Sequence, residues 1–354
     1  MIRACVAAMG IGMCGWTACG QAQAHHAAAD GLRAAENVLL YQRDTGGWPK
    51  NYDRLATLTQ QERQQVLGEK SSDDATIDNG ATHTEIRLLA RAYRQEPDAR
   101  YRVAALRGIE YLLDGQYDNG GWPQFFPRAH GYQRYITFND GAMIGVLRLL
   151  RDVAAGEEVF AFVPDVTRRR CRRAVERGIE CMLACQVRVR GRRTVWCAQH
   201  DHVTFAPRQG RSYELASLSG AESVGVVRFL MEIDDPSLEV VQAIEGAVDW
   251  FERSQLEDLK LVRVDDDRAP RGFDWKVVRD PEARPMWARF YDIQTNQPIF
   301  CSRDGVPQDS LAKISCERRT GYSWLGAYAR ELLTHDLPAW RRRINPPRTD
   351  GDAR

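Results

Sequence analysis

The chain has 354 residues, of which 44% are hydrophobic and 27% are charged, and its formal net charge is +1. This composition is typical of a soluble globular protein, and the length allows one large domain or two ordinary ones. The balanced charge excludes both a global basic field for binding nucleic acid and a strongly acidic tail.

The first 24 residues differ from the rest. Arg3 is their only charged side chain, a run of apolar and small residues follows it, and residues 22–24 (Ala-Gln-Ala) fit the small-x-small rule for cleavage. The apolar run is too short and too rich in glycine to span a membrane well. We therefore predict a signal peptide over 1–24, a secreted or periplasmic protein without a membrane span, and one folded domain over 25–343. Residues 344–354 are predicted to be a disordered tail.

Amphipathic segments that end in glutamine recur along the chain. They cover residues 34–42, 105–116, 174–186 and 243–255, and their terminal glutamines are Gln42, Gln116, Gln186 and Gln255, spaced 74, 70 and 69 residues apart. A period of this kind indicates a repeated structural unit.

A second helix follows each of the first three glutamines. Residues 82–95, 140–153 and 220–233 each carry apolar side chains at helical spacing. Alternating runs long enough for a large sheet are scarce. These repeated helical hairpins predict an all-α fold, an α/α toroid with long functional loops on one face.

The string Gly-Gly-Trp-Pro occurs twice, around Trp48 and Trp122, each time just after a terminal glutamine. The glycines allow a tight turn, the proline prevents the helix from continuing, and the tryptophan can fill a gap between neighbouring hairpins. A tryptophan beside a cleft can equally stack on a sugar ring, so both roles stay open.

Two pairs of polar residues precede the returning helices at equivalent places. Asp78 and Asn79 stand ahead of one helix, and Asn139 and Asp140 stand ahead of the next. Either pair can simply cap its helix. In a toroid, however, equivalent turns converge on one face, and several hard oxygen atoms brought together suit Ca²⁺.

Two further segments are rich in polar and aromatic side chains. The segment 196–223 contains His200, His202, Arg208, Arg211, Tyr213 and Glu214, and the segment 289–306 contains Arg289 and Arg303. A zinc site at His200 and His202 lacks a third ligand at a familiar spacing. Calcium ligands together with arginine forks indicate a polyanion whose charges are carboxylates. A phosphate ligand is less suited, because no glycine-rich phosphate-binding loop is present.

These segments resemble blocks of the pectate lyases of polysaccharide lyase family ten. The matching strings are GGWPKN, ATIDNGAT, GGWPQFFP, ITFNDGAM, WCAQHD, YELASLSGAES, RFYDI followed by TNQPIFCSRDG, and ERRTGYSWLG. They occur in the family's order over roughly residues 38–324. The resemblance implies an α/α toroid that cleaves α-1,4-linked polygalacturonate by β-elimination, with Ca²⁺ and with an arginine as the Brønsted base.

The resemblance also implies roles for individual residues. Arg211 resembles the catalytic base, and Asp78 and Asp140 resemble the acids that hold calcium, with Asn79 and Asn139 as helpers. The remaining positions are expected to bind substrate: Arg289, Arg303, Tyr213 and Lys50. An arginine is an awkward base because its pKa is above about 12, so a crowded cationic site is expected to disfavour its charged form.

Two departures from the family pattern affect these roles. Gly210 stands before the proposed base where alanine is more typical, so Arg208 remains a rival for the base position. Gln297 stands where an arginine is expected, which weakens one expected substrate contact. His200 and His202 rank second as bases and are expected to order the loop.

Other classes of protein remain as alternatives. A glycoside hydrolase acting on an acidic polysaccharide would use two carboxylates and a water molecule. A non-catalytic pectin-binding protein would bind the polymer without shortening it. A terpene cyclase needs an acidic motif, and the only acidic cluster, residues 265–267, falls in an expected surface loop. Assembly as a monomer is the simplest expectation.

Overall fold

The computed structural model describes residues 30–345, and the leader predicted for 1–24 and residues 346–354 of the predicted tail lie outside the described residues. The helices are a first helix over residues 30–41, α2 (Gln60–Gly68), α3 (His83–Gln95), α4 (Ala99–Asp114), α5 (Ala142–Ala155), α6 (Asp165–Cys185), α7 (Glu222–Met231), α8 (Leu238–Arg253), α9 (Cys316–Gly321) and α10 (Leu337–Ile344). Among the helices of the described range, none is both long enough and apolar enough to cross a lipid bilayer.

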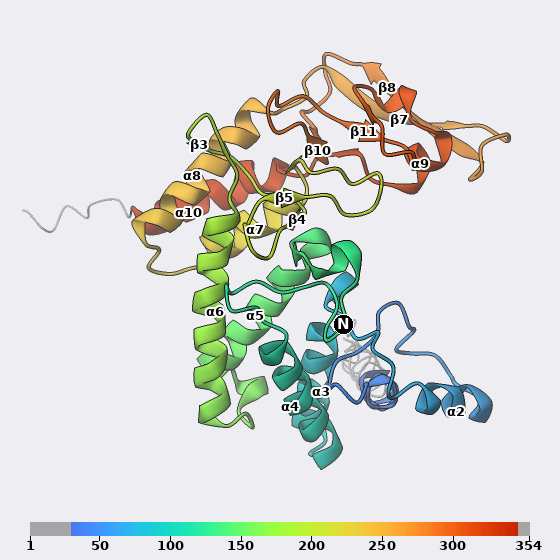
Figure 1. Cartoon of the computed structure of the whole chain (residues 1–354), viewed down its shortest axis with the longest axis vertical. Helices are drawn as coiled ribbons and strands as arrows, with labels where there is room; N and C mark the ends of the chain where they lie inside the picture. The colour runs from blue at the N-terminus through green and yellow to red at the C-terminus, as the bar shows by residue number, and fades with distance from the viewer. Residues whose placement is uncertain (1–29, 346–354) are drawn as a thin grey trace, which may run out of the picture.

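The helices pack as hairpins in two layers, as the repeat predicts. α3 packs against α4, α5 against α6, and α7 against α8. Helices α3, α5 and α7 contact one another in sequence to form one layer, and α4, α6 and α8 form the other (Figure 1). The predicted apolar faces are buried, as on α5, where Met143, Leu147 and Leu150 have no exposed surface. Burying each such side chain stabilises the fold by about 1.5–3 kcal/mol.

The periodic glutamines join consecutive hairpins. The side-chain amide of Gln42 donates to the carbonyl oxygens of Gly46 in its own loop and Ala104 in α4. Gln116 does the same with Gly120 and Ala174, and Gln186 with Thr194 and Ala243. Each glutamine thus ties its loop to the next helix of the layer formed by α4, α6 and α8. Gln255 is half-buried and makes no such bond within residues 30–345.

The tryptophans of the two Gly-Gly-Trp-Pro turns belong to the core. Trp48 and Trp122 are at most 1% exposed, and their indole N–H groups donate at 2.7 Å to the carbonyl oxygens of Val38 and Leu112. Trp196 and Trp287 are buried in the same way, and their indole N–H groups donate to backbone carbonyl oxygens in α6 and α8. Packing between hairpins is therefore their role, and stacking on a sugar is excluded by burial.

The glycines of these turns allow the close approach. A Cβ atom on Gly46 would lie 2.6 Å from the carbonyl oxygen of Arg107, and one on Gly120 would lie 2.1 Å from that of Arg177. Both glycines also have positive φ angles, +97° and +89°. Only glycine satisfies both conditions.

The description all-α needs a correction, because the chain also forms short antiparallel sheets. The strands are β1 (Ile136–Thr137), β2 (Arg188–Val189), β3 (Arg192–Arg193), β4 (Gln199–His200), β5 (Pro207–Arg208), β6 (Leu218–Ser219), β7 (Leu259–Asp265), β8 (Phe273–Arg279), β9 (Trp287–Ala288), β10 (Phe290–Tyr291), β11 (Phe300–Cys301), β12 (Pro307–Gln308) and β13 (Leu325–Gly326). Only β7 and β8 are long, and they form one hairpin paired from Leu259↔Arg279 to Asp265↔Phe273. This hairpin includes the acidic cluster at 265–267, which lies at its turn.

The molecule has two parts in Figure 1. Helices α3–α6 form the lower part, whereas α8, α10 and the hairpin β7–β8 lie in the upper part. Strand β1 lies in the loop between α4 and α5, and β4 and β5 lie in the loop between α6 and α7. These three strands form one sheet, which joins the two loops. That sheet and the pair β6–β10 position the polar residues described next.

Candidate active site

Two equivalent turns form the floor of the site. The segments η1 (Asp78–Gly80) and η3 (Asn139–Gly141) are single 3₁₀ turns immediately before α3 and α5, and they contact each other. Their central residues, Asn79 and Asp140, adopt the left-handed conformation with φ of 51° and 49°. Asn and Asp tolerate this conformation better than most residues. The repeat thus places the two Asn/Asp pairs side by side, as the sequence predicts.

Asp78 is buried and is held by Lys50. Its side chain is 4% exposed, and the Lys50 ammonium group donates to one of its carboxylate oxygens. The other oxygen, Oδ1, is buried without a hydrogen-bond partner among the described residues. An unpaired buried carboxylate oxygen is costly, and a cation relieves that cost. Asn79 lies at the surface, where its amide donates to Asn51 at 3.0 Å.

Asp140 is more accessible and faces Arg289. Its side chain is 39% exposed, and Oδ1 lies 3.4 Å from Nη2 of Arg289. The Asn139 amide donates to the other oxygen of Asp140 at 2.6 Å. The side-chain oxygen Oδ1 of Asn139 also lies 3.5 Å from Nη2 of Arg289. Asp140 is therefore the acid of this pair that a ligand reaches from solvent.

Arg289 connects η3 to the first turn of α7. The pairing of β10 with β6 places it there, because its carbonyl oxygen accepts a hydrogen bond from the N–H of Gly220 at 2.9 Å. Its guanidinium group forms an ion pair with the buried Glu222. Burial lowers the pKa of Arg289, but Glu222, Tyr322 and Asp140 together outweigh that effect and raise the pKa above its ordinary value. Arg289 is thus a fixed positive charge.

Arg211 lies on the same aromatic ring as Arg289. The guanidinium carbon of Arg289 is 4.6 Å from the ring centroid of Tyr322, and that of Arg211 is 5.6 Å from it. The ring therefore brings together arginines that are 78 residues apart in the chain. The predicted base and the predicted subsite arginine belong to one site.

Arg211 is paired, contrary to the expectation of a crowded cationic site. Glu214, whose side chain is 3% exposed, accepts from both its backbone N–H and its guanidinium group. The hydrogen bond that Arg211 donates to Glu214 raises the pKa of Arg211 above its ordinary value. The expectation that neighbouring cations lower this pKa is therefore wrong, because the carboxylate of Glu214 accepts a hydrogen bond from the guanidinium group and raises the pKa. The role of Arg211 as base stays a prediction.

Arg208, the rival for that role, is held in a different way. Its guanidinium group donates to Asp201 at 3.0 Å and lies over the ring of Tyr135. The backbone N–H groups of Thr204 and Val203 also bind Asp201 and help to lower its pKa. Arg208 thus closes a structured loop, and it does not share the ring of Tyr322.

Arg303 belongs to a second cluster next to Arg211. The guanidinium carbons of Arg211, Arg303 and Arg318 lie 5.0, 5.8 and 4.6 Å from the ring centroid of Tyr213. Glu317 accepts from Arg303 at 3.0 Å and from Arg318. Tyr213 itself is 4% exposed, so its ring packs beneath these three guanidinium groups and is largely covered from solvent.

His200 orders the loop, as ranked from the sequence. The residue is fully buried, its Nε2 accepts from the N–H of Cys197 at 2.9 Å, and its Nδ1 donates to the carbonyl oxygen of Phe205 at 2.8 Å. Burial lowers its pKa to about 4, so the ring is neutral. His202 packs against Tyr117. Neither histidine joins a metal cluster, because residues 30–345 contain no group of three His, Cys, Asp or Glu side chains able to hold a metal ion.

That finding also bears on calcium. The described chain offers the carboxylates of Asp78 and Asp140 on adjoining turns, with one unpartnered oxygen on Asp78, and these hard oxygens suit Ca²⁺. Two carboxylates do not complete its coordination of six to eight oxygens. The residues therefore fit a calcium ion that takes its remaining ligands from a bound polyanion and from water.

Sequence reasoning missed several residues of the site. Glu222 stands two positions after Gly220, which aligns with Gly80 and Gly141, but the residues that align with Glu222 are Thr82 and Met143, so the repeat gives no signal for it. Tyr322 and Arg318 lie in a matching string but carried no prediction. Burial raises the pKa of Tyr132 in η2 (Gly131–Arg134), and the charges of Arg211 and Asp78 nearby also act on it. Gln297 is exposed on the loop after β10.

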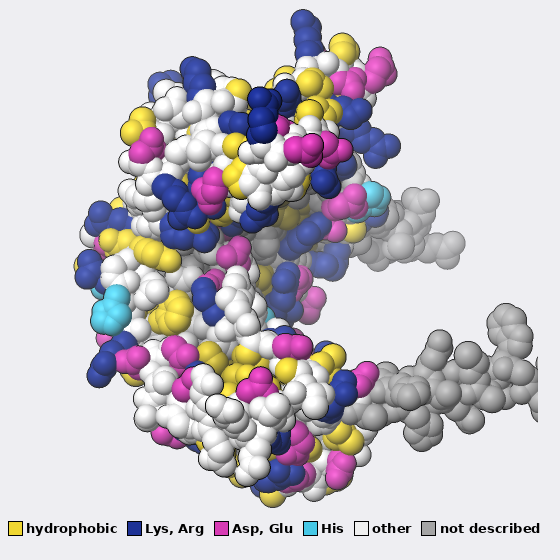
Figure 2. All heavy atoms as spheres, turned by 90° about the vertical axis from the view of Figure 1, so that its right-hand side faces the viewer, with side chains coloured by type: hydrophobic (Ala, Val, Ile, Leu, Met, Phe, Trp, Pro, Cys, Tyr) yellow, Lys and Arg dark blue, Asp and Glu magenta, His cyan; other side chains and the backbone are white. Residues whose placement is uncertain are grey.

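One face of the molecule carries a basic hollow. Figure 2 shows that this face is hollowed between the upper and lower parts and that Lys and Arg side chains gather around the hollow. The described arginines and aspartates come from loops of both parts, which matches an extended anionic ligand lying between them.

Comparison with known proteins agrees with this geometry. Residues 42–333 match the family model described as pectic acid lyase. A variant of a family 10 polysaccharide lyase from Cellvibrio cellulosa, solved in complex with trigalacturonic acid, is 36% identical with a TM-score of 0.77, covering 90% of this chain and 95% of that chain. Another structure of the family 10 polysaccharide lyase from Cellvibrio cellulosa is 35% identical with a TM-score of 0.75, covering 91% and 95%. No curated protein matches significantly. Because the family match spans most of the chain and includes the site, this chain belongs to the pectic acid lyase family and is a polysaccharide lyase.

Proposed function

We propose that the protein is a calcium-dependent pectate lyase that cleaves α-1,4-polygalacturonate by β-elimination and leaves 4,5-unsaturated oligogalacturonates. The observation that carries the proposal is the shared ring of Tyr322, which places Arg211 and Arg289 together while Arg289 reaches Asp140. The trigalacturonic acid bound to the Cellvibrio cellulosa lyase supports a galacturonate substrate. The two helical layers support an α/α toroid as the scaffold.

The chemistry explains why the site needs cations. The proton on C5 of a uronate becomes acidic only when the charge of the adjacent carboxylate is neutralised, because its removal forms an enolate-like species. As the C5–H electron pair forms the C4–C5 double bond, the C4–O bond breaks and the glycosidic oxygen takes up a proton. No water is consumed, in contrast to a hydrolase.

The residues divide this work. Arg289, fixed between Glu222 and Asp140, and Arg303, which is 65% exposed, are placed to grip substrate carboxylates. Arg211 removes the C5 proton as a neutral guanidine. Because Glu214 raises the pKa of Arg211, the hydrogen bond between them must break before Arg211 accepts a proton. The neutral form of Arg211 becomes more populated as the pH rises, so the rate is expected to increase with pH.

Asp78 and Asp140 would hold the calcium ion, with Asn79 and Asn139 beside them. When bound, the ion would neutralise the substrate carboxylate as a Lewis acid. Lys50 already occupies one oxygen of Asp78, so it either shares that carboxylate or moves to the substrate. Secretion or periplasmic location and a monomeric state complete the proposal.

The decisive experiment follows the ultraviolet absorbance of the unsaturated product. We expect the mature protein to generate that absorbance from polygalacturonate with Ca²⁺ and to lose it in EDTA. Replacing the base, Arg211→Ala, should lower kcat by about 10²–10⁴-fold. The matched variant Arg208→Ala removes an arginine from the same loop and should keep most of the activity.

Each alternative predicts a different result. New reducing ends without absorbance would indicate a hydrolase, and binding without shortening would indicate a pectin-binding protein. A large loss in Arg208→Ala with normal activity in Arg211→Ala would move the base to Arg208.

A further inference from the structure

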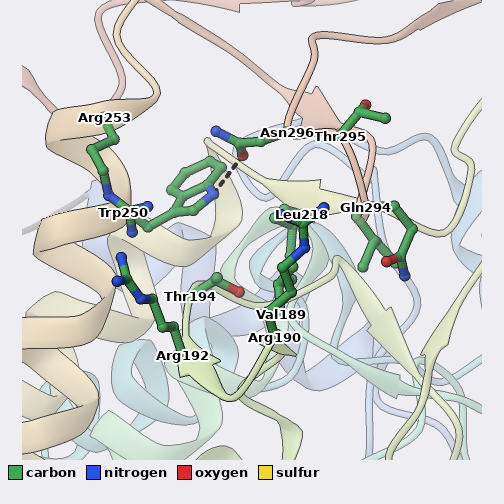
Figure 3. Close-up of a pocket in the computed structure, with 11 residues that line it drawn as sticks. Val189, Arg190, Arg192, Thr194, Leu218, Trp250, Arg253, Gln294, Thr295 and Asn296 are labelled. Carbon is green, nitrogen blue, oxygen red and sulfur yellow. Dashed lines mark hydrogen bonds between the residues drawn. The ribbon is translucent and has the colours of Figure 1, made fainter.

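A second pocket lies outside the candidate active site. Its volume is 600 Å³, and it is formed by the hairpin β2–β3, the C-terminal end of α8 and the loop after β10 (Figure 3). None of the residues that line it is among those assigned above to base, calcium or substrate carboxylate. The pocket therefore needs its own explanation.

The charged side chains of this pocket are all arginines: Arg190, Arg192 and Arg253. Arg253 is paired with Asp249 at 2.7 Å. Arg190 and Arg192 are exposed and have no carboxylate within 4 Å among residues 30–345. They flank the tight turn at Gly191, whose φ is +80°. A pocket with two unpaired guanidinium groups and no lining acid favours an anionic ligand.

The opposite wall carries hydrogen-bonding groups held in a fixed conformation. Gln294, Thr295 and Asn296 follow Asp292, whose carboxylate accepts from the backbone N–H groups of Gln294 and Thr295. The Asn296 side chain accepts from the Trp250 indole at 2.7 Å and donates to Ser254 at 2.9 Å, and the first of these bonds is drawn in Figure 3. The amide and hydroxyl groups of Gln294 and Thr295 remain exposed on this ordered loop.

The hairpin that carries the arginines is also anchored. The amide of Gln186 donates to the carbonyl oxygen of Thr194, and Arg193 bonds to Gln186 and to Glu239. Arg192 therefore projects from a supported backbone. Preorganised walls reduce the entropic cost of binding.

We propose that this pocket is a second binding site for a uronate stretch of the substrate polymer, away from the site of cleavage. Arg190 and Arg192 bind the carboxylates, and the side chains of Gln294 and Thr295 bind sugar hydroxyl groups. The proposal rests on the proposed function for the identity of the polymer. A second site on one chain raises the effective concentration of the polymer at the first.

The test measures binding without cleavage. In EDTA, the wild-type protein and the double variant Arg190→Ala/Arg192→Ala are run in native gels containing polygalacturonate. We expect the double variant to bind about tenfold more weakly. The matched control is Arg188→Ala/Arg169→Ala, which removes two exposed arginines outside the pocket and should bind like wild type. With Ca²⁺, cleavage of trigalacturonate by the double variant should stay within about twofold of wild type, because one short ligand needs only one site.

Several outcomes would overturn the proposal. One is that Arg190→Ala/Arg192→Ala binds polygalacturonate as tightly as wild type, and another is that the control variant loses as much affinity as the pocket variant. A third is that the pocket variant loses affinity for dextran sulfate to the same extent, which would mean general attraction of polyanions. Absence of lyase product from the wild-type protein would instead reject the proposed function, while the binding measurement would still judge the pocket.

Discussion

Arg289 links more parts of the site than any other residue described above. It contacts Asn139 and Asp140 before α5, Glu222 in α7 and the ring of Tyr322. A guanidinium group can do this because its donors point in several directions of one plane, whereas an ammonium group is a point charge. Arg289, proposed to bind the polymer, is thus held in place by protein carboxylates.

At the same scale, His200 makes stability depend on pH. Its pKa is lowered to about 4 in the fold from an ordinary 6.5, so between these values the unfolded chain binds more protons than the folded one. Its contribution is present above pH 6.5 and is lost as the pH falls toward 4. The full effect is on the order of 3 kcal/mol.

We therefore expect the free energy of unfolding to fall between pH 7 and pH 4, measured by denaturant titration. The variant His200→Gln, although less stable, should show a weaker dependence in this range. An unchanged slope would mean that other groups, such as the half-buried His83, govern the pH dependence.

At the scale of elements, the glutamines and tryptophans at the hairpin junctions explain how similar units build one body. Each of Gln42, Gln116 and Gln186 satisfies two carbonyl groups that belong to different elements. Buried carbonyl groups left without donors are costly, so these side chains stabilise the junctions as well as filling them.

We expect Gln116→Leu to lower the free energy of unfolding by about 2–3 kcal/mol, because it leaves the carbonyl groups of Gly120 and Ala174 without their donor. The chain contains its own control in Gln255→Leu, which removes the glutamine that makes no such bond and should change stability by less than about 0.5 kcal/mol. If denaturant titrations gave equal losses of stability for Gln116→Leu and Gln255→Leu, the proposed role of Gln116 in joining consecutive hairpins would be rejected.

At the scale of the whole molecule, the proposed calcium site joins two hairpins and remains incomplete without a polyanion. Residues 30–345 place two predicted ligand carboxylates on adjoining turns but contain no cluster of three metal-binding side chains. Calcium and substrate should therefore bind together, each providing what the other lacks.

We expect Ca²⁺ alone to raise the melting temperature of the Arg211→Ala protein only slightly. Ca²⁺ together with trigalacturonate at about 100 times its Kd should raise it by about 4 °C. The variant Asp140→Asn, compared in the same inactive background, should lose the joint effect. A large shift with calcium alone would show that the chain already forms a complete site.

Much of the fold is predictable from local pattern. The 3.6-residue spacing of apolar side chains located α3 to α8, because one face of each helix must be buried wherever it packs. The regular glutamines indicated the repeat, and the repeat placed η1 beside η3. The hairpin β7–β8 was missed because its side chains are half-buried or exposed on both faces, so it carries little of the burial that makes a strand visible in a sequence.

The amino-acid sequence by itself determined the helical hairpins, the family and the set of residues from which the site is built. Only the tertiary structure decided the pairing of those residues: Lys50 with Asp78, Arg211 with Glu214, and Arg289 with Glu222 across 67 positions. The physical reason is that helix formation depends on near neighbours in the chain, whereas the ionic state of a side chain depends on whichever charges the packing of distant segments brings within a few ångströms.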